Sequence, residues 1–166
     1  MQMILILTVL AALVLYVSYY DFRWMIIPDG ATAGVLFVGA GYQFLATGLT
    51  GATEGLAFAI AVFGGFWLVR LTYMKYRGIA GLGFGDVKFA GAAAIWLSPL
   101  AFPVYLFVAT SSALIFLVVG TIFRGGSLSR RIPFGPFLAF ALFVSVVADR
   151  FGNISQVFTH EIAFQF

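Results

Sequence analysis

Charged residues divide this chain into long apolar runs, and these runs give the first prediction of structure. Each run is free of Asp, Glu, Lys and Arg. A helix that crosses the hydrocarbon core of a bilayer needs about 17 to 25 predominantly apolar residues. The pattern therefore predicts membrane-spanning helices. The runs are Met1 to Tyr20, Gly30 to Thr53, Gly55 to Val69, Phe89 to Phe123 and Ile132 to Ala148.

Two of the runs do not correspond to one span each. The third is short, but the Arg70 side chain can reach the membrane surface while Leu71 to Met74 prolong the helix. The fourth has 35 residues, which is too long for one helix, and it contains Pro99 and Pro103. We therefore predict six spans, at residues 2–20, 30–49, 55–74, 87–97, 102–123 and 132–148.

The basic residues predict the orientation of these spans, because Lys and Arg in short loops mark the cytoplasmic side. With six spans and an N-terminus outside the cytoplasm, Arg150 is the only one of the nine basic residues on the outer side. The prediction is an all-α polytopic membrane protein, N-out and C-out, with one membrane-embedded domain over residues 1–166 and a tail at 153–166. Residues 1–20 lack a basic start and a small-residue cleavage site, so we expect a retained span rather than a signal peptide. The basic residues on the cytoplasmic side are Arg23, Arg70, Lys75, Arg77, Lys88, Arg124, Arg130 and Arg131.

Composition narrows the classes of function. Of the 166 residues, 63% are hydrophobic and 9% are charged, which excludes an ordinary soluble domain. The absence of cysteine excludes disulfides, thiolate metal sites and a cysteine nucleophile. The net charge of +3 needs no nucleic acid to explain it. We expect the lipid bilayer as a partner, and no metal or other cofactor.

Three aspartates fall at the predicted cytoplasmic ends of spans, where an ionisable group suggests function. They are Asp21 after the first span, Asp29 before the second and Asp86 before the fourth. Two aspartates from different helices in a poorly hydrated site share a proton and titrate as a pair. Such a pair supplies the acid and the base of aspartic proteolysis.

The local sequence separates the three aspartates. Asp29 follows Pro28 and precedes an apolar run, as expected of a residue that caps a helix N-terminus. Asp21 ends a helix, where a negative charge meets the negative end of the helix dipole, so capping does not explain it. Asp86 could cap a helix, but a glycine-rich segment over residues 78–85 precedes it and allows close approach of a substrate or a helix. That segment lacks the Lys-Ser/Thr of a phosphate-binding loop.

Three segments together resemble one family. Residues 21–29 read DFRWMIIPD, residues 83–88 read GFGDVK and residues 132–139 read IPFGPFLA. In this order, on one predicted membrane face, they are similar to the type IV prepilin leader peptidases, which are membrane-embedded aspartic proteases of the G-x-G-D class. The resemblance extends over nearly the whole chain.

The resemblance implies a catalytic pair formed by Asp21 and Asp86, and Asp29 matches a position that need not be acidic. Lys88 would favour the ionised form of Asp86, pair with a substrate carboxylate or extend to lipid headgroups, and Arg23 has the same interpretations. Gly135 and Pro136 would begin and pack the last span. The resemblance therefore implies substrate-binding or supporting positions at Arg23, Asp29, Gly83, Gly85, Lys88, Gly135 and Pro136.

The implied substrate is a prepilin or pseudopilin precursor, cut between a short basic leader and an apolar helix at the cytoplasmic face of the inner membrane. Larger family members carry an N-terminal cytoplasmic domain with cysteine pairs and also N-methylate the product. This chain starts in a span and has no cysteine, so we expect a peptidase without methylation. Two alternatives are a small secondary transporter with carboxylates on broken helices and a purely structural membrane subunit.

Overall fold

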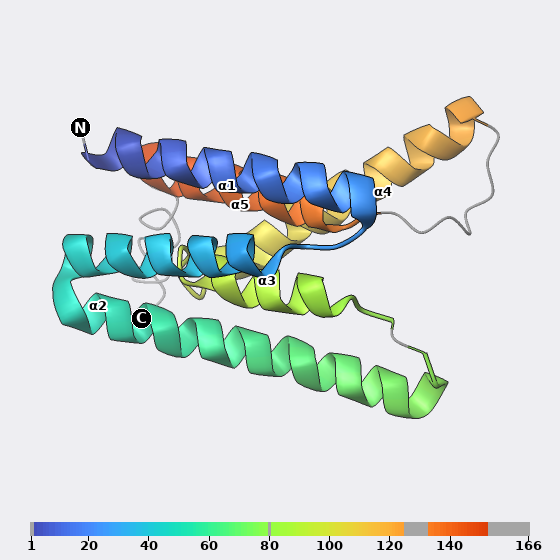
Figure 1. Cartoon of the computed structure of the whole chain (residues 1–166), viewed down its shortest axis with the longest axis horizontal. Helices are drawn as coiled ribbons and strands as arrows, with labels where there is room; N and C mark the ends of the chain where they lie inside the picture. Colours follow the sequence, from blue (N-terminus) through green and yellow to red (C-terminus); the bar gives the residue numbers. More distant parts are fainter. Residues whose placement is uncertain (1, 80, 125–132, 153–166) are drawn as a thin grey trace, which may run out of the picture.

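The computed structural model describes residues 2–79, 81–124 and 133–152, and these ranges are helical without a strand (Figure 1). This confirms the predicted all-α class. Residue 132, where the last predicted span begins, and the tail at 153–166 lie outside the described residues. The helices are α1 (Gln2–Trp24), α2 (Asp29–Arg77), α3 (Phe84–Ala94), α4 (Ala101–Arg124) and α5 (Gly135–Gly152).

Helix α2 contains a reversal at Gly48, so that its 49 residues form two antiparallel segments (Figure 1). Gly48 has φ 72° and ψ −160°, a backbone conformation that only glycine adopts readily. The turn falls one residue before the predicted end of the second span. The second segment follows without the loop that we expected at 50–54, and it continues to Arg77.

We expect Gly48→Ala to destabilise the protein by about 1–3 kcal/mol, because alanine is strained at this φ and ψ. No atom lies within 4 Å of a Cβ at Gly48, so the effect comes from the backbone alone. Gly41→Ala is the matched control, since its Cβ also meets no atom within 4 Å and no positive φ is recorded there. Thermal unfolding in detergent, followed by circular dichroism, measures the difference. Equal melting temperatures for the two variants would contradict this assignment of strain.

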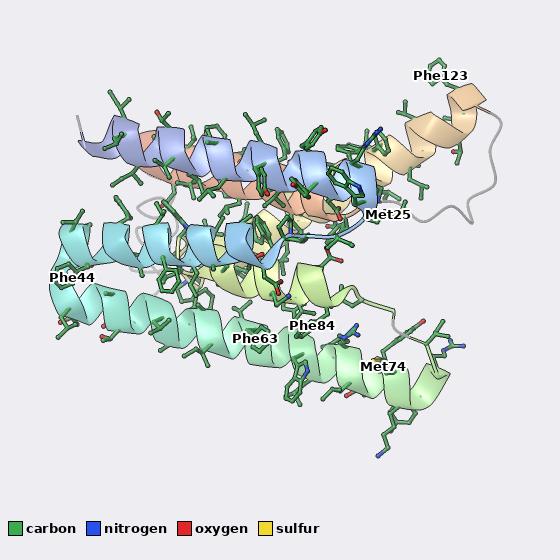
Figure 2. All side chains as sticks on the ribbon, viewed as in Figure 1. Met25, Phe44, Phe63, Met74, Phe84 and Phe123 are labelled. Atoms are coloured by element: carbon green, nitrogen blue, oxygen red, sulfur yellow. The ribbon has the colours of Figure 1, made fainter. Side chains whose placement is uncertain are left out.

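Helices α1, α2 and α4 are long and apolar enough to cross a membrane, and α5 is a shorter apolar helix. Large side chains such as Phe44 and Phe123 are exposed on the bundle, as a bilayer environment requires (Figure 2). Helix α3 has 11 residues and is about 16 Å long, roughly half of a hydrocarbon core. The helix that we predicted at 87–97 therefore lies at 84–94, and the count of six spans stays a prediction.

Helix α3 packs mainly against α2, and it also contacts α5. Its residues from Phe89 to Ala94 are buried. A Cβ at Gly91 would lie 2.9 Å from the Cβ of Phe63, so the small residues of α3 allow α2 to approach closely. Just beyond α3, Trp96 Nε1 donates a hydrogen bond of 2.9 Å to the Val35 carbonyl. These contacts fix α3 inside the bundle.

The backbone conformations of Met25 and Pro28 mark the end of α1 and the start of α2. Met25 adopts the left-handed region with φ 54°, and its N–H donates to the carbonyl of Asp21 at 2.9 Å. This is the αL arrangement that commonly ends helices. Pro28 then precedes α2 with φ −65° and ψ 132°. The end of α1, the start of α3 and the segment before α5 line one cavity.

Candidate active site

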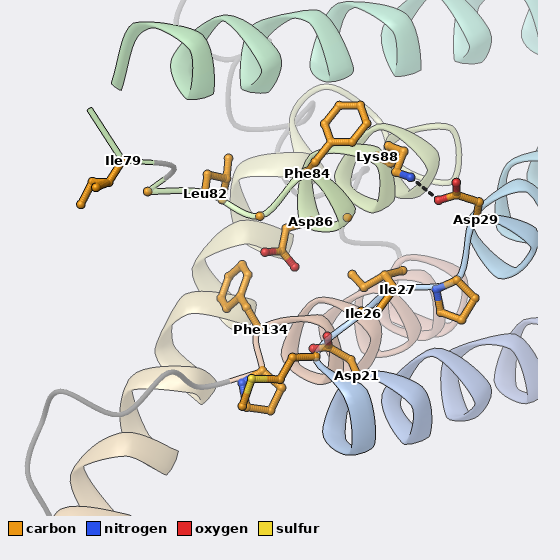
Figure 3. A pocket seen from close by; sticks show the side chains of 16 residues that line it. Asp21, Ile26, Ile27, Asp29, Ile79, Leu82, Phe84, Asp86, Lys88 and Phe134 are labelled. Atoms are coloured by element: carbon orange, nitrogen blue, oxygen red, sulfur yellow. Dashed lines mark hydrogen bonds and ion pairs between the residues drawn. The ribbon is translucent and has the colours of Figure 1, made fainter. Parts of the chain in front are cut away.

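A cavity of about 1280 Å³ lies between the end of α1, the start of α3 and the segment before α5 (Figure 3). Asp21 and Asp86 point into it from opposite sides (Figure 3). Asp29 also lines it, so all three aspartates singled out in the sequence lie at one cavity. Most of its other walls are apolar, including Ile27 and Phe134.

Asp21 is held by the N-terminus of α5. Its side chain is 5% exposed, and its Oδ2 accepts a hydrogen bond of 2.8 Å from the N–H of Gly135. Gly135 is the first residue of α5, and Pro136 after it has no N–H. The N-terminus of a helix carries unpaired N–H groups and a partial positive charge, which favour a carboxylate. The start of α5 at Gly135 thus binds the Asp21 carboxylate.

Asp86 lies in the first turn of α3, outside the three span-length helices. Gly83 is the N-cap, and its backbone N–H donates to the Asp86 carboxylate three residues later. This is the half of a capping box in which an acidic side chain reaches back. Burial, and then the charge of Asp21, raise the pKa of Asp86 to about 6, although the Gly83 hydrogen bond opposes the rise. Two such carboxyl groups can share one proton.

Glycines make room for both carboxylates. A Cβ at Gly135 would lie 2.7 Å from Oδ2 of Asp21, and a Cβ at Gly83 would lie 2.6 Å from Oδ2 of Asp86. A Cβ at Gly85 would lie 3.2 Å from the Cβ of Ile27 on the opposite wall. Gly83 and Gly135 therefore leave space for the two carboxylates, and Gly85 allows Ile27 to approach α3.

Asp29 and Lys88 form an ion pair at the edge of the cavity (Figure 3). Pro28 is the N-cap of α2, and no side chain makes a cap hydrogen bond there. The predicted capping role of the Asp29 side chain is therefore wrong, although the helix does begin at this residue. Lys88 pairs with Asp29, which none of its three interpretations included, and it also lies 5.0 Å from the centre of the Phe84 ring.

Three predicted residues do not line the cavity, and of these only Gly135 contacts a carboxylate of the site. One residue that contacts the segment before Asp86 was missed. Arg23 is exposed in the last turn of α1, and Pro136 is buried in α5, and neither lines the cavity as described. Arg70 was expected to reach the membrane surface, but its Nη1 donates a hydrogen bond of 2.6 Å to the Leu82 carbonyl. The signal for Arg70 in the sequence was that it is a single basic residue directly after an apolar run.

The described residues contain no group of three or more His, Asp or Glu side chains that could hold a metal ion. The chemistry that the cavity offers is that of its carboxyl groups. One ionised and one protonated carboxyl group, facing the same space, can act on a water molecule and a carbonyl oxygen as base and acid.

Comparisons with known proteins agree with the motifs. The model of the type IV leader peptidase family matches residues 8–120. The chain is 36% identical to leader peptidase HopD of Escherichia coli over 141 residues, which is 81% of this chain and 86% of that protein. It is 28% identical to a prepilin leader peptidase/N-methyltransferase of Aeromonas salmonicida, over 78% of this chain and 44% of that protein. No solved structure matches the chain significantly. The chain belongs to the type IV leader peptidase family, as its three motifs predict.

Proposed function

We propose that this protein is an aspartic endopeptidase that removes the leader peptide of prepilin-like precursors, with Asp21 and Asp86 as its catalytic pair. The observation that carries the proposal is that these two carboxyl groups, from α1 and α3, face one cavity and interact electrostatically. Membership of the leader peptidase family supports the reaction class. The transporter and the structural-subunit alternatives have no comparable support.

The proposed reaction needs only a water molecule and the two carboxyl groups. The ionised aspartate takes a proton from water while the water oxygen bonds to the scissile carbonyl carbon. The protonated aspartate donates a hydrogen bond to the developing oxyanion. When the tetrahedral intermediate collapses, the C–N bond breaks and the leaving amine takes a proton from the pair. Two carboxyl groups that face one largely apolar cavity favour the singly protonated state that this reaction requires.

The remaining predicted residues have supporting roles in this proposal. The N–H groups of Gly83 and Gly135 orient the two carboxylates, and Gly85 keeps the opposite wall close. Lys88 and Asp29 close one edge of the cavity as an ion pair. No metal and no organic cofactor takes part, because a carboxylate is sufficient as the base.

We place the protein in the inner membrane with the cavity at the cytoplasmic face. The support is the distribution of basic residues, of which only Arg150 falls on the other side in the six-span topology. Trp24 and Tyr19 at the end of α1 are exposed and in ring contact, as is common where a helix leaves the hydrocarbon core. A leader that remains in the cytoplasm would then reach the cavity from the aqueous side.

We expect the protein to shorten a coexpressed prepilin by its leader and to leave the new N-terminus unmethylated. The chain has no cysteine, and it matches 86% of the length of the relative named only as a peptidase. Intact mass measurement of the pilin from membranes tests both statements, with an empty-vector strain and a prepilin peptidase/N-methyltransferase as references. An uncut precursor would overturn the proposed activity, and a product with the mass of an added methyl group would overturn only the second statement.

A further inference from the structure

Arg70 is fixed against the segment that carries Asp86. It comes from the second segment of α2, and its Nη1 donates a hydrogen bond of 2.6 Å to the carbonyl of Leu82. Its guanidinium carbon lies 5.6 Å from the centre of the Phe84 ring, within the range of a cation–π contact. Phe84 also makes an edge contact with Phe63, at 6.4 Å between ring centres. The residues on both sides of Gly83 are thus held by α2.

The Leu82 carbonyl and the Gly83 N–H belong to one peptide unit. A peptide unit is planar, and in the trans form its C=O and N–H point in opposite directions. The oxygen accepts from Arg70, and the N–H donates to the carboxylate of Asp86. The Asp86 carboxylate lies against Gly83, since a Cβ on Gly83 would lie 2.6 Å from Oδ2 of Asp86. A single peptide unit therefore connects the cation to the acid.

We propose that Arg70 is a positioning residue for Asp86, and that it acts through the Leu82–Gly83 peptide. A cation bound to the oxygen of a peptide polarises its N–H and strengthens the hydrogen bond that this group donates. Arg70 then orients the Asp86 carboxylate and favours its ionised form, although the guanidinium does not touch it. The expected effect of Arg70 on catalysis rests on the proposed function, whereas its structural link to Asp86 does not.

Other titratable groups also lie near Asp86. Asp21 of α1 disfavours the ionised form of Asp86 by like-charge repulsion. Tyr105 of α4 is buried and interacts electrostatically with Asp86. Lys88, on the same helix as Asp86, is paired with Asp29. Among the described residues, the Gly83 backbone lowers the pKa of Asp86, and Arg70 holds the peptide to which this N–H belongs.

The test is a direct titration of Asp86 in the full-length protein. The chain contains four aspartates, so ¹³C labelling of the aspartate carboxyl group gives four signals, and Asp86→Asn identifies the one that belongs to Asp86. In detergent micelles we expect Arg70→Gln to move the Asp86 midpoint upward by about half a pH unit to one pH unit. Arg70→Lys, which keeps the charge but not the planar guanidinium, should give a smaller upward shift.

Arg77→Gln is the matched control, because it removes the same charge from an exposed position on the same helix. Its Asp86 midpoint should stay at the wild-type value. Equal midpoints in Arg70→Gln and Arg77→Gln overturn the inference. If Arg70→Gln is not recovered in folded form, Arg70→Lys is compared with Arg77→Lys by the same criterion.

Cleavage of a coexpressed prepilin separates this inference from the proposed function. With both correct, the pH profile of Arg70→Gln moves in the same direction as the Asp86 midpoint, and Arg77→Gln leaves the profile unchanged. A wild-type protein that does not cut any prepilin contradicts the proposed function, while the carboxyl titration still decides the role of Arg70.

Discussion

Asp21→Asn and Asp86→Asn each reduce leader removal by about 10²- to 10⁴-fold, the range found when a general acid or base is lost. Asparagine keeps the size of the side chain, and its oxygen still accepts the hydrogen bonds from Gly135 and Gly83. It cannot take or hold the proton that the pair must share. The losses are therefore chemical, and the helices around the cavity keep their positions. Time courses of prepilin processing in membranes that contain equal amounts of each variant measure the effect.

Asp29→Asn is the control for this experiment, because Asp29 lines the same cavity. Its side chain is 78% exposed, and its ion pair with Lys88 is of the kind that contributes little to stability. We expect processing within about threefold of the wild type, given the small energies of exposed pairs. An inactive Asp29→Asn beside an active Asp21→Asn would show that Asp29 is the partner of Asp86. Equal cleavage by all variants would refute aspartic proteolysis.

The sequence predicts the helical segments well, because charges and prolines interrupt apolar runs at recognisable places. It places the turn inside α2 at residues 50–54, two residues after the observed reversal at Gly48. Gly48 is one of 19 glycines, and only its backbone conformation, with φ 72° and ψ −160°, distinguishes it. The short length of α3 was predicted, but its position was three residues off, since the apolar residues continue through Ile95 to Leu97 while the helix already ends at Ala94.

In the candidate site, too, the sequence predicts some features and misses others. The aspartates and the glycines near them were found from motif and position, since ionisable residues are rare in such a chain. Their partners depend on contacts between distant segments. Gly135 lies 114 residues from Asp21, and Lys88 lies 59 residues from Asp29. Local rules therefore assigned the Asp29 side chain to the helix end beside it, and they assigned Arg70 to the membrane surface.

Gly135→Ala should reduce leader removal by about 100-fold without a change in fold. The added Cβ would lie 2.7 Å from Oδ2, 2.9 Å from Cγ and 3.1 Å from Cβ of Asp21. The whole side chain must therefore move, and a displacement of about 1 Å in a catalytic group can reduce the rate by 10²-fold. Initial rates of prepilin processing measure the loss, and the helix content of the purified variant shows whether the fold is kept.

Gly83→Ala should have a smaller effect, of about tenfold by the same reasoning. Its Cβ would lie 2.6 Å from Oδ2 of Asp86 but 3.4 Å from Cγ, so a rotation of the carboxylate relieves the contact. The backbone itself tolerates alanine, with φ −61° and ψ 138°. Gly30→Ala, beside Asp29, is the control, because nothing lies within 4 Å of its Cβ. If Gly135→Ala and Gly83→Ala both process prepilin as fast as Gly30→Ala, the carboxylates do not need their present positions, and the catalytic pair would have to form by a movement of α1 or α3.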